Sequence, residues 1–214
     1  MSEVTVLFDG YSRESNKNEM SANCTCTFIK GEHNIIVDTM TAWDSVNILT
    51  ALDKLNIKPE QIDYVVSTHG HSDHIGNNNL FLHAKHIVGF SLSFKDTYYL
   101  HPFENGVEYI INDSVKVIPT PGHTLSDVTV IVKTKDMDTI AVAGDLFEKF
   151  EDIEDGNIWL TAGSENPPLQ MKNRSKVADL ANWIIPGHGP KFKVTEEIRE
   201  SLRRQKDENH GSSR

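Results

Sequence analysis

The sequence lacks any apolar run that approaches the roughly 20 residues needed to cross a bilayer. Residues 1–6 also lack the basic segment and apolar stretch with which a secretory signal begins. We therefore expect neither a membrane protein nor a secreted one, and we predict a cytoplasmic (cytosolic) location with access to the nucleus.

Cysteine is scarce, with Cys24 and Cys26 as the only two. Their spacing on a predicted strand places both side chains on one face, too close in sequence for an easy disulfide. We expect two buried thiols, because free cysteine is among the most buried residue types. A soft-metal or redox pair is the alternative.

Positive charge is also in short supply, since 21 basic and 31 acidic residues give a formal net charge of −10. Nucleic-acid-binding proteins usually carry a basic footprint, so the total charge argues against that class. The distribution is uneven, because residues 171–206 contain nine basic and four acidic side chains. This basic segment either guides a polyanion or forms ordinary helices with solvated charges. The acidic side chains between residues 148 and 155 would repel phosphate unless they point away or pair with the basic helices.

The 214 residues suffice for one sizeable core, and no linker divides them. We predict a single domain over residues 1–206 and a disordered polar tail over residues 207–214. Residues 11–21 are predicted to form a mobile polar loop or a lid. Strands are expected at residues 4–8, 24–30, 34–38, 86–89, 108–111, 115–118, 128–132 and 139–142, and helices at 43–55, 168–180 and 196–206.

The most informative segment is THGHSDH at residues 68–74, which places four metal-binding side chains directly after the apolar run of residues 64–66. Imidazole and carboxylate ligands together suit zinc, iron or manganese. Further candidates follow later apolar runs in the segments PGHT, AGD and PGHG, where glycine or proline marks the strand end. Strand ends position side chains rigidly enough for a metal site. The predicted metal-binding set is His69, His71, Asp73, His74, His123, Asp145 and His188.

These motifs resemble the metallo-β-lactamase superfamily over roughly residues 4–195. The resemblance implies an α+β fold, a four-layer αβ/βα sandwich with the metals at one edge of two mixed sheets. It implies two divalent metal ions, with zinc expected and iron or manganese as alternatives. In this arrangement His69, His71 and His123 would hold one ion, Asp73, His74 and His188 would hold the other, and Asp145 would bridge them.

The resemblance also implies hydrolysis, with a metal-bridging hydroxide as nucleophile and Asp73 as the catalytic residue that orients it. Asp38 and Thr68 are expected either to orient the metal-binding imidazoles or to be simple turn residues. Glu148 is the nearest acidic candidate for protonating a leaving group. Asp145 stands where true β-lactamases of this superfamily often have cysteine, which argues against antibiotic hydrolysis.

The segments THGHSDHIGN, GDLFE and PGHGP are similar to one animal subgroup of the superfamily. That similarity implies a homodimeric endoribonuclease acting on RNA at the 3′ ends of histone pre-mRNA. The alternatives are a glyoxalase II-like hydrolase of thioesters or small esters, a single-iron enzyme oxidising a persulfide, and a non-enzymatic binding protein. The complete ligand set argues against the last two, while the short segment after His188 argues against a glutathione thioester.

Overall fold

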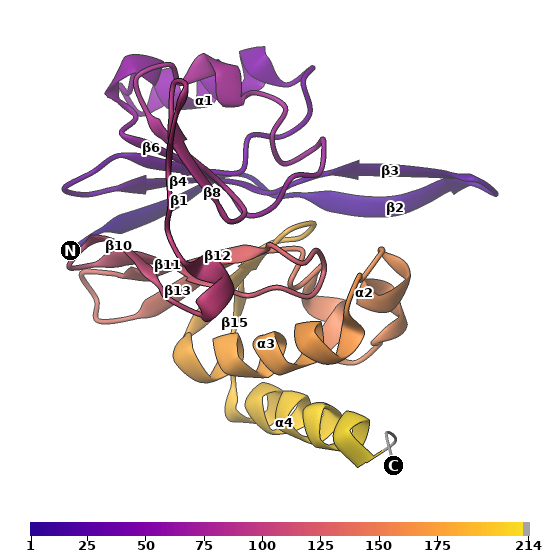
Figure 1. Ribbon diagram of the computed structural model, residues 1–214. Coiled ribbons are helices and arrows are strands. Elements are labelled where there is room, and N and C mark those ends of the chain that lie inside the picture. The colour runs from indigo at the N-terminus through magenta and orange to yellow at the C-terminus, as the bar shows by residue number, and fades with distance from the viewer. Residues whose placement is uncertain (212–214) are drawn as a thin grey trace.

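The computed structural model describes the backbone of residues 1–211 and the side chains of residues 1–207. Two β-sheets pack face to face, and helices cover their outer faces, as Figure 1 shows. This is the α+β sandwich that the sequence predicted. No helix among residues 1–211 has the length and apolar character of a bilayer span.

The first sheet carries α1 (Ser45–Lys54) on its outer face (Figure 1). Its strands are, in spatial order, β1 (Glu3–Phe8), β4 (Cys26–Lys30), β5 (Ile35–Val37), β6 (Tyr64–Ser67), β7 (Lys85–Val88), β8 (Ser91–Phe94) and β9 (Thr97–Tyr99). Short 3₁₀ turns at Pro59–Gln61 and Asn78–Leu80 lie in its connections, and another at Phe103–Asn105 lies in the segment that leads to the second sheet.

The second sheet is covered by α3 (Pro167–Leu180) and α4 (Glu196–Gly211), with α2 (Asn157–Thr161) and a 3₁₀ turn at Phe150–Ile153 beside them. Its strands are, in spatial order, β10 (Tyr109–Asn112), β11 (Val115–Pro119), β12 (Val128–Lys133), β13 (Thr139–Gly144), β14 (Trp183–Pro186) and β15 (Phe192–Lys193).

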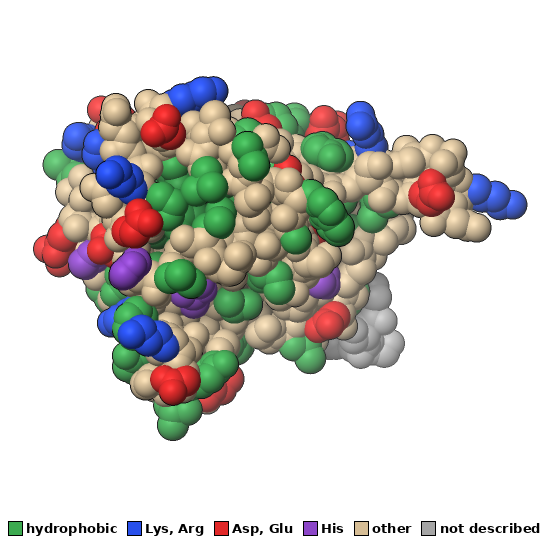
Figure 2. All heavy atoms as spheres, turned by 90° about the horizontal axis from the view of Figure 1, so that it is seen from above, with side chains coloured by type: hydrophobic (Ala, Val, Ile, Leu, Met, Phe, Trp, Pro, Cys, Tyr) green, Lys and Arg blue, Asp and Glu red, His purple; other side chains and the backbone are tan. Residues whose placement is uncertain are grey.

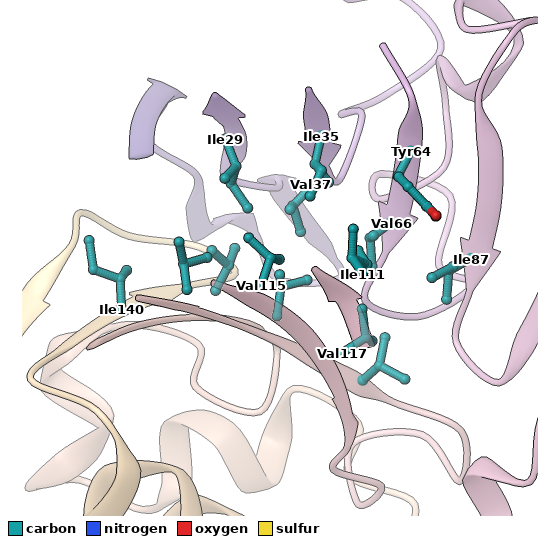
Figure 3. Close-up of a cluster of buried hydrophobic side chains, with 14 of the residues drawn as sticks. Ile29, Ile35, Val37, Tyr64, Val66, Ile87, Ile111, Val115, Val117 and Ile140 are labelled. Carbon is teal, nitrogen blue, oxygen red and sulfur yellow. The ribbon is translucent and has the colours of Figure 1, made fainter. Parts of the chain in front are cut away.

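The central strands are apolar on both faces because each sheet is covered on both sides. In β5, Ile35 and Val37 face the second sheet, whereas Ile36 faces α1. The same two-residue period recurs in β13, where Ile140 lies between the sheets and Ala141 packs toward the helices. Figure 3 shows side chains from the two sheets pointing toward one another in this core: Ile29, Val37 and Val66 face Val115, Val117 and Ile140.

Strand direction brings several chain segments to one edge of the sandwich. β5 and β6 are parallel, as are β13 and β14, and β11 runs in the same direction as β13 because each is antiparallel to β12. Backbone hydrogen bonds join the two sheets at this edge, from Val128 N–H to the Thr68 carbonyl at 2.9 Å and from Thr25 N–H to the Gly187 carbonyl at 2.6 Å. The residues that follow these strands therefore converge.

Residues 11–21 were predicted to form a mobile polar loop or a lid, and the prediction of an irregular loop was wrong. They belong to a hairpin of β2 (Tyr11–Asn16) and β3 (Glu19–Asn23) that projects from the sandwich, as Figures 1 and 2 show. The sequence hides these strands because both faces are polar, so no apolar alternation marks them. The turn between them is stabilised by a 2.7 Å hydrogen bond from the Asn16 amide to the Glu19 carboxylate.

The disordered tail was predicted to begin at residue 207, whereas α4 continues to Gly211. The segment between Lys206 and Gly211 contains no proline or glycine, so nothing in it interrupts the helical hydrogen bonds. Residues 207–211 are therefore helical rather than disordered. The rest of the predicted tail lies outside the described residues.

Candidate metal centre

The predicted metal-binding side chains lie together at the edge where the two sheets meet. β6 leads into the segment with His69, β11 into the loop with His123, β13 into Asp145 and β14 into the turn with His188. Gly144 has a φ of +54°, and a Cβ there would overlap the Thr68 hydroxyl, so the residue before Asp145 must be glycine. The close packing of these strand ends allows side chains from both sheets to meet.

Four side chains form the first ligand group, which comprises His69, His71, His123 and Asp145. His71 Nδ1 lies 2.8 Å from His69 Nε2 and 3.2 Å from His123 Nε2. Asp145 Oδ2 lies 3.6 Å from His69 Nε2 and 3.4 Å from His123 Nε2. Ligands at zinc-like bond lengths in a tetrahedron are about 3.4 Å apart, so this group suits a tetrahedral ion.

The second ligand group comprises Asp73, His74 and His188, with Asp145 shared between the two groups. Asp145 Oδ1 lies 3.2 Å from His74 Nε2, and its Oδ2 lies 3.3 Å from His188 Nε2. Asp73 Oδ2 lies 3.9 Å from His74 Nε2 and 3.8 Å from His188 Nε2. The Asp145 carboxylate thus contacts both groups, as a bridging ligand must.

Residues around the second group fix the orientation of its imidazoles. Asp38 Oδ2 lies 3.0 Å from His74 Nδ1, and Asp38 Oδ1 accepts a 2.7 Å hydrogen bond from the Thr68 backbone N–H. Asp38 has a φ of +56°, an uncommon conformation for a residue other than glycine. With a proton on Nδ1, His74 keeps Nε2 free for a metal ion. Asp38 and Thr68 are therefore part of the site rather than simple turn residues.

The hairpin base orients His188 in the same way. Its Nδ1 lies 3.2 Å from the Tyr11 carbonyl and 3.1 Å from the Asn23 carbonyl, and both are acceptors for an Nδ1 proton. Asn23 is itself held by the loop before α1, because its amide donates to Asp44 at 2.9 Å. This interaction could not be predicted from the sequence, since the acceptors are backbone atoms.

The electrostatics of the metal-free chain differ between the two groups. Burial holds the pKa of His69 well below its ordinary value, and it also lowers that of His123. Burial opposes charge on His74 and His188 too, but the Asp145 carboxylate overcomes it, raising the pKa of His74 well above the ordinary range and that of His188 to about 9. Burial raises the pKa of Asp145, yet these charged imidazoles depress it further and it lies well below normal. Positive charge is therefore drawn to the second group.

The donor set fits divalent metal ions. Among the described residues, His74 Nε2 and Asp145 Oδ1 are buried without a hydrogen-bond partner, although they face each other across the second group. Unpaired buried polar atoms are costly, and a cation between them would pair both. Imidazole and carboxylate ligands suit zinc, iron or manganese.

A buried support beneath the site comes from α3. Gln170 Nε2 donates to the Asp145 carbonyl at 3.0 Å, and Arg174 Nη1 donates to the Leu146 carbonyl at 2.9 Å. Arg174 also makes a 2.6 Å ion pair with Asp152, with both side chains fully buried. This pair corrects the prediction that Arg174 belongs to a solvated or polyanion-guiding surface. Asp152, one of the acids expected to repel phosphate, is neutralised by the pair.

Other charges of the basic segment also have partners within the protein. Arg199 donates to the Ala178 and Ala181 carbonyls at the end of α3, and Arg203 makes a 2.6 Å ion pair with Asp179. The helices of the segment pack on the second sheet through their apolar residues. The predicted interpretation of this segment as ordinary amphipathic helices fits these contacts better than a polyanion guide.

The two cysteines are both buried and free. Cys24 lies within ligand distance of Asp38 and His74, although Asp38 and Thr68 already interact with that imidazole. Burial raises the pKa of both thiols, and the Asp38 charge raises it further. Both therefore stay protonated at neutral pH, which fits the predicted buried thiols rather than a soft-metal pair.

Comparisons with known proteins agree with this fold. A family model described as the metallo-beta-lactamase superfamily matches residues 22–206. Metallo-beta-lactamase domain-containing protein 1 from Xenopus laevis is 39% identical over 89% of this chain and 81% of its own length. The human protein of that name is also 39% identical, over 76% of this chain and 60% of its own length. The chain thus spans less than two thirds of the human relative, and these animal proteins are the subgroup that the sequence motifs indicated.

Solved structures of similar fold share little sequence with this chain. A metallo beta lactamase from Hirschia baltica has a TM-score of 0.59 at 16% identity, covering 90% of both chains. A B. thuringiensis AiiA mutant with N-decanoyl-L-homoserine at its active site has a TM-score of 0.60 at 16% identity, covering 88% of this chain and 92% of its own. At such identities the likeness shows the fold alone.

Proposed function

The chain belongs to the metallo-β-lactamase superfamily, and we propose that it is a two-metal hydrolase that cleaves phosphodiester bonds in RNA. The observation that carries the two-metal assignment is the position of Asp145 between the two ligand groups. Its Oδ2 contacts the first group, and its Oδ1 and Oδ2 contact His74 and His188 of the second. The first group would hold zinc. When bound, two divalent ions make hydroxide available at neutral pH and stabilise negative charge on the attacked group.

Asp73 is the residue we propose to orient the attacking water. Its side chain is 19% exposed, whereas Asp145 is 5% exposed, so Asp73 lies at the open side of the ligand cluster. A carboxylate in this position can accept a hydrogen bond from water and direct its lone pair toward a substrate above the site. His74 and His188 remain fixed through their Nδ1 partners, so the site stays ordered while substrate enters.

RNA is proposed as substrate from the likeness to the animal metallo-beta-lactamase domain-containing protein 1 group, with histone pre-mRNA 3′ ends as the specific target. A homodimer and a cytosolic location with access to the nucleus are proposed from the same resemblance of sequence motifs. The structure adds one constraint. On the face seen in Figure 2, basic and acidic side chains are interspersed rather than gathered in one basic patch. This face therefore offers RNA no basic patch, so any attraction to phosphate there would come mainly from the ions.

The second candidate is a hydrolase of thioesters or small esters, which uses the same ligand groups. It is favoured by the internal partners of Arg174, Arg199 and Arg203, which leave fewer arginines for a polyanion. Such a substrate needs only the ions and a small binding surface.

The deciding experiment is cleavage of single-stranded RNA and of a thioester by metal-quantified protein. Asp73→Ala and His123→Ala should abolish RNA cleavage while the protein stays folded. Asp136→Ala, an exposed change in the connection between β12 and β13 at the far end of the sheet, should leave it unchanged. Thioester turnover without RNA cleavage would establish the second candidate. Activity that survives Asp73→Ala would contradict both.

A further inference from the structure

Glu148 is a buried carboxylate beside the second ligand group. It lies three residues beyond Asp145 and is 3% exposed. Its backbone is fixed on both sides, because its N–H donates to Asp152 Oδ2 at 2.7 Å and its carbonyl accepts from the His188 N–H at 2.7 Å. The side chain is therefore held next to His188 by the same turn that carries the ligands.

This carboxylate has no compensating partner among the side chains of residues 1–207. No lysine or arginine in that range pairs with it, and no donor forms a hydrogen bond to it. Its one close polar contact is His188 Nε2, 4.0 Å from its Oε2. The nearest buried arginine, Arg174, already pairs with Asp152. A largely buried carboxylate without a donor is costly in its charged form, and a cation beside it would offset that cost.

The ligand separations of the two groups differ. In the first group the measured distances run from 2.8 to 3.6 Å, close to the edges of a tetrahedron. Around His188 Nε2 they are 3.3 Å to Asp145, 3.8 Å to Asp73 and 4.0 Å to Glu148. Adjacent and opposite ligands of a six-coordinate ion at about 2.2 Å are roughly 3.1 and 4.4 Å apart. Two separations in the second group are also short, at 3.2 and 3.3 Å from Asp145 to His74 and His188. The group is wider only on the side of Asp73 and Glu148, and that spread fits a higher coordination number.

We propose that Glu148 is a ligand of the second metal site, which then offers three carboxylates and two imidazoles and accepts Mn²⁺ or Fe²⁺ more readily than the first site does. Asp145, Glu148 and His188 place their ligand atoms within 4.8 Å of one another. This inference rests on the proposed two-metal function. The chemical reason is that carboxylate oxygens and high coordination suit Mn²⁺, whereas three imidazoles and one carboxylate in a tetrahedron suit zinc.

The test measures metal binding rather than activity. Metal-free protein receives one equivalent of Zn²⁺ to fill the first site, and Mn²⁺ is then titrated and followed by calorimetry and by the electron paramagnetic resonance of free Mn²⁺. Wild-type protein should bind one Mn²⁺ per chain. Glu148→Gln keeps the side-chain shape and should weaken that binding by at least 10-fold. A loss of about 10- to 100-fold is typical even when the changed residue only supports a metal ligand.

Glu151→Gln is the matched control, because Glu151 belongs to the same acidic stretch but is exposed. It should bind Mn²⁺ as the wild type does. An affinity in Glu148→Gln within twofold of the wild type would overturn the inference while leaving the two-metal function intact. Wild-type protein that binds fewer than two ions in total would overturn both.

A crystal structure of the wild-type protein with Mn²⁺ tests the same point without any variant. Anomalous scattering should locate manganese in the second group, with a Glu148 oxygen about 2.2 Å away. Manganese there with Glu148 turned away from it would also refute the assignment.

Discussion

Replacing Arg174 by methionine should destabilise the protein by about 3–5 kcal/mol, because it leaves the Asp152 carboxylate buried and unpaired. Both side chains are fully buried, and Arg174 Nη2 lies 2.6 Å from Asp152 Oδ1. The guanidinium also donates to the Leu146 carbonyl and packs over the Phe147 ring, with Arg174 Cζ 4.3 Å from the ring centre. Methionine would keep part of that packing but none of the hydrogen bonds.

The pair between Arg203 and Asp179 provides a control of the same length. It also measures 2.6 Å, but both side chains are 43% exposed, so water already solvates the charges. Arg203→Met should therefore change the free energy of unfolding very little. Urea unfolding followed by circular dichroism compares the two variants, and for a domain of this size each kcal/mol corresponds to about 2–4 °C in Tm.

Adding Asp152→Asn to Arg174→Met should recover part of the lost stability, because most of the cost is the unpaired charge. The amide oxygen can still accept the Glu148 N–H, which donates to Asp152 at 2.7 Å in the wild type. The reasoning is refuted if Arg174→Met unfolds at the same urea concentration as Arg203→Met. It is also refuted if the double variant is less stable than the single one.

Metal content, thiol reactivity and the pH dependence of stability provide three further tests. Gly187→Ala should lose metal, measured as ions per chain after dialysis, because the added Cβ would overlap Asp145 Oδ1. Gly70→Ala is the control and should keep both ions, because its added Cβ meets no atom within 4 Å. Equal metal content in the two variants would contradict this prediction. Both cysteines should resist thiol reagents in the native protein and react in denaturant, since burial raises their pKa, and fast native labelling would show them to be exposed. The metal-free protein should lose stability between about pH 6.5 and 9, because His188 has a raised pKa of about 9 and loses over this range a proton that stabilises the folded state. Bound metal should remove this pH dependence. An unfolding midpoint that rises with pH over this range would contradict the prediction.

The ligands could be predicted from the sequence because their positions follow strand ends. A strand buried on both faces appears as a short apolar run, and glycine or proline flanks the polar residue that follows it, so the residues after β6 and β13 are recognisable without coordinates. Because β5 and β6 are parallel, as are β13 and β14, the ends of these strands lie at the same edge of the sandwich. The histidine and aspartate residues at these positions then indicated a site for divalent metal ions.

The surroundings of the ligands could not be predicted in this way. His188 is oriented by the Tyr11 and Asn23 carbonyls, and no side chain marks a backbone acceptor. Arg174 and Gln170 were hidden because a charged or polar residue on a helix is usually solvated, and the sequence does not show that carbonyls of the Asp145 turn lie opposite. The contacts that join distant segments depend on the completed fold.

The PGHG segment at residues 186–189 both supplies a ligand and shapes the surroundings of the other ligands. Its glycine at 187 lies against the Asp145 carboxylate so closely that any side chain would displace a ligand shared by both groups. His188 follows directly and reaches Asp145 Oδ2 at 3.3 Å, while its backbone N–H binds the Glu148 carbonyl. One short turn therefore supplies a ligand, makes room for the bridging carboxylate and holds Glu148 in place. Small changes in this turn should alter both metal sites together, whereas Glu148 alone should affect only the second.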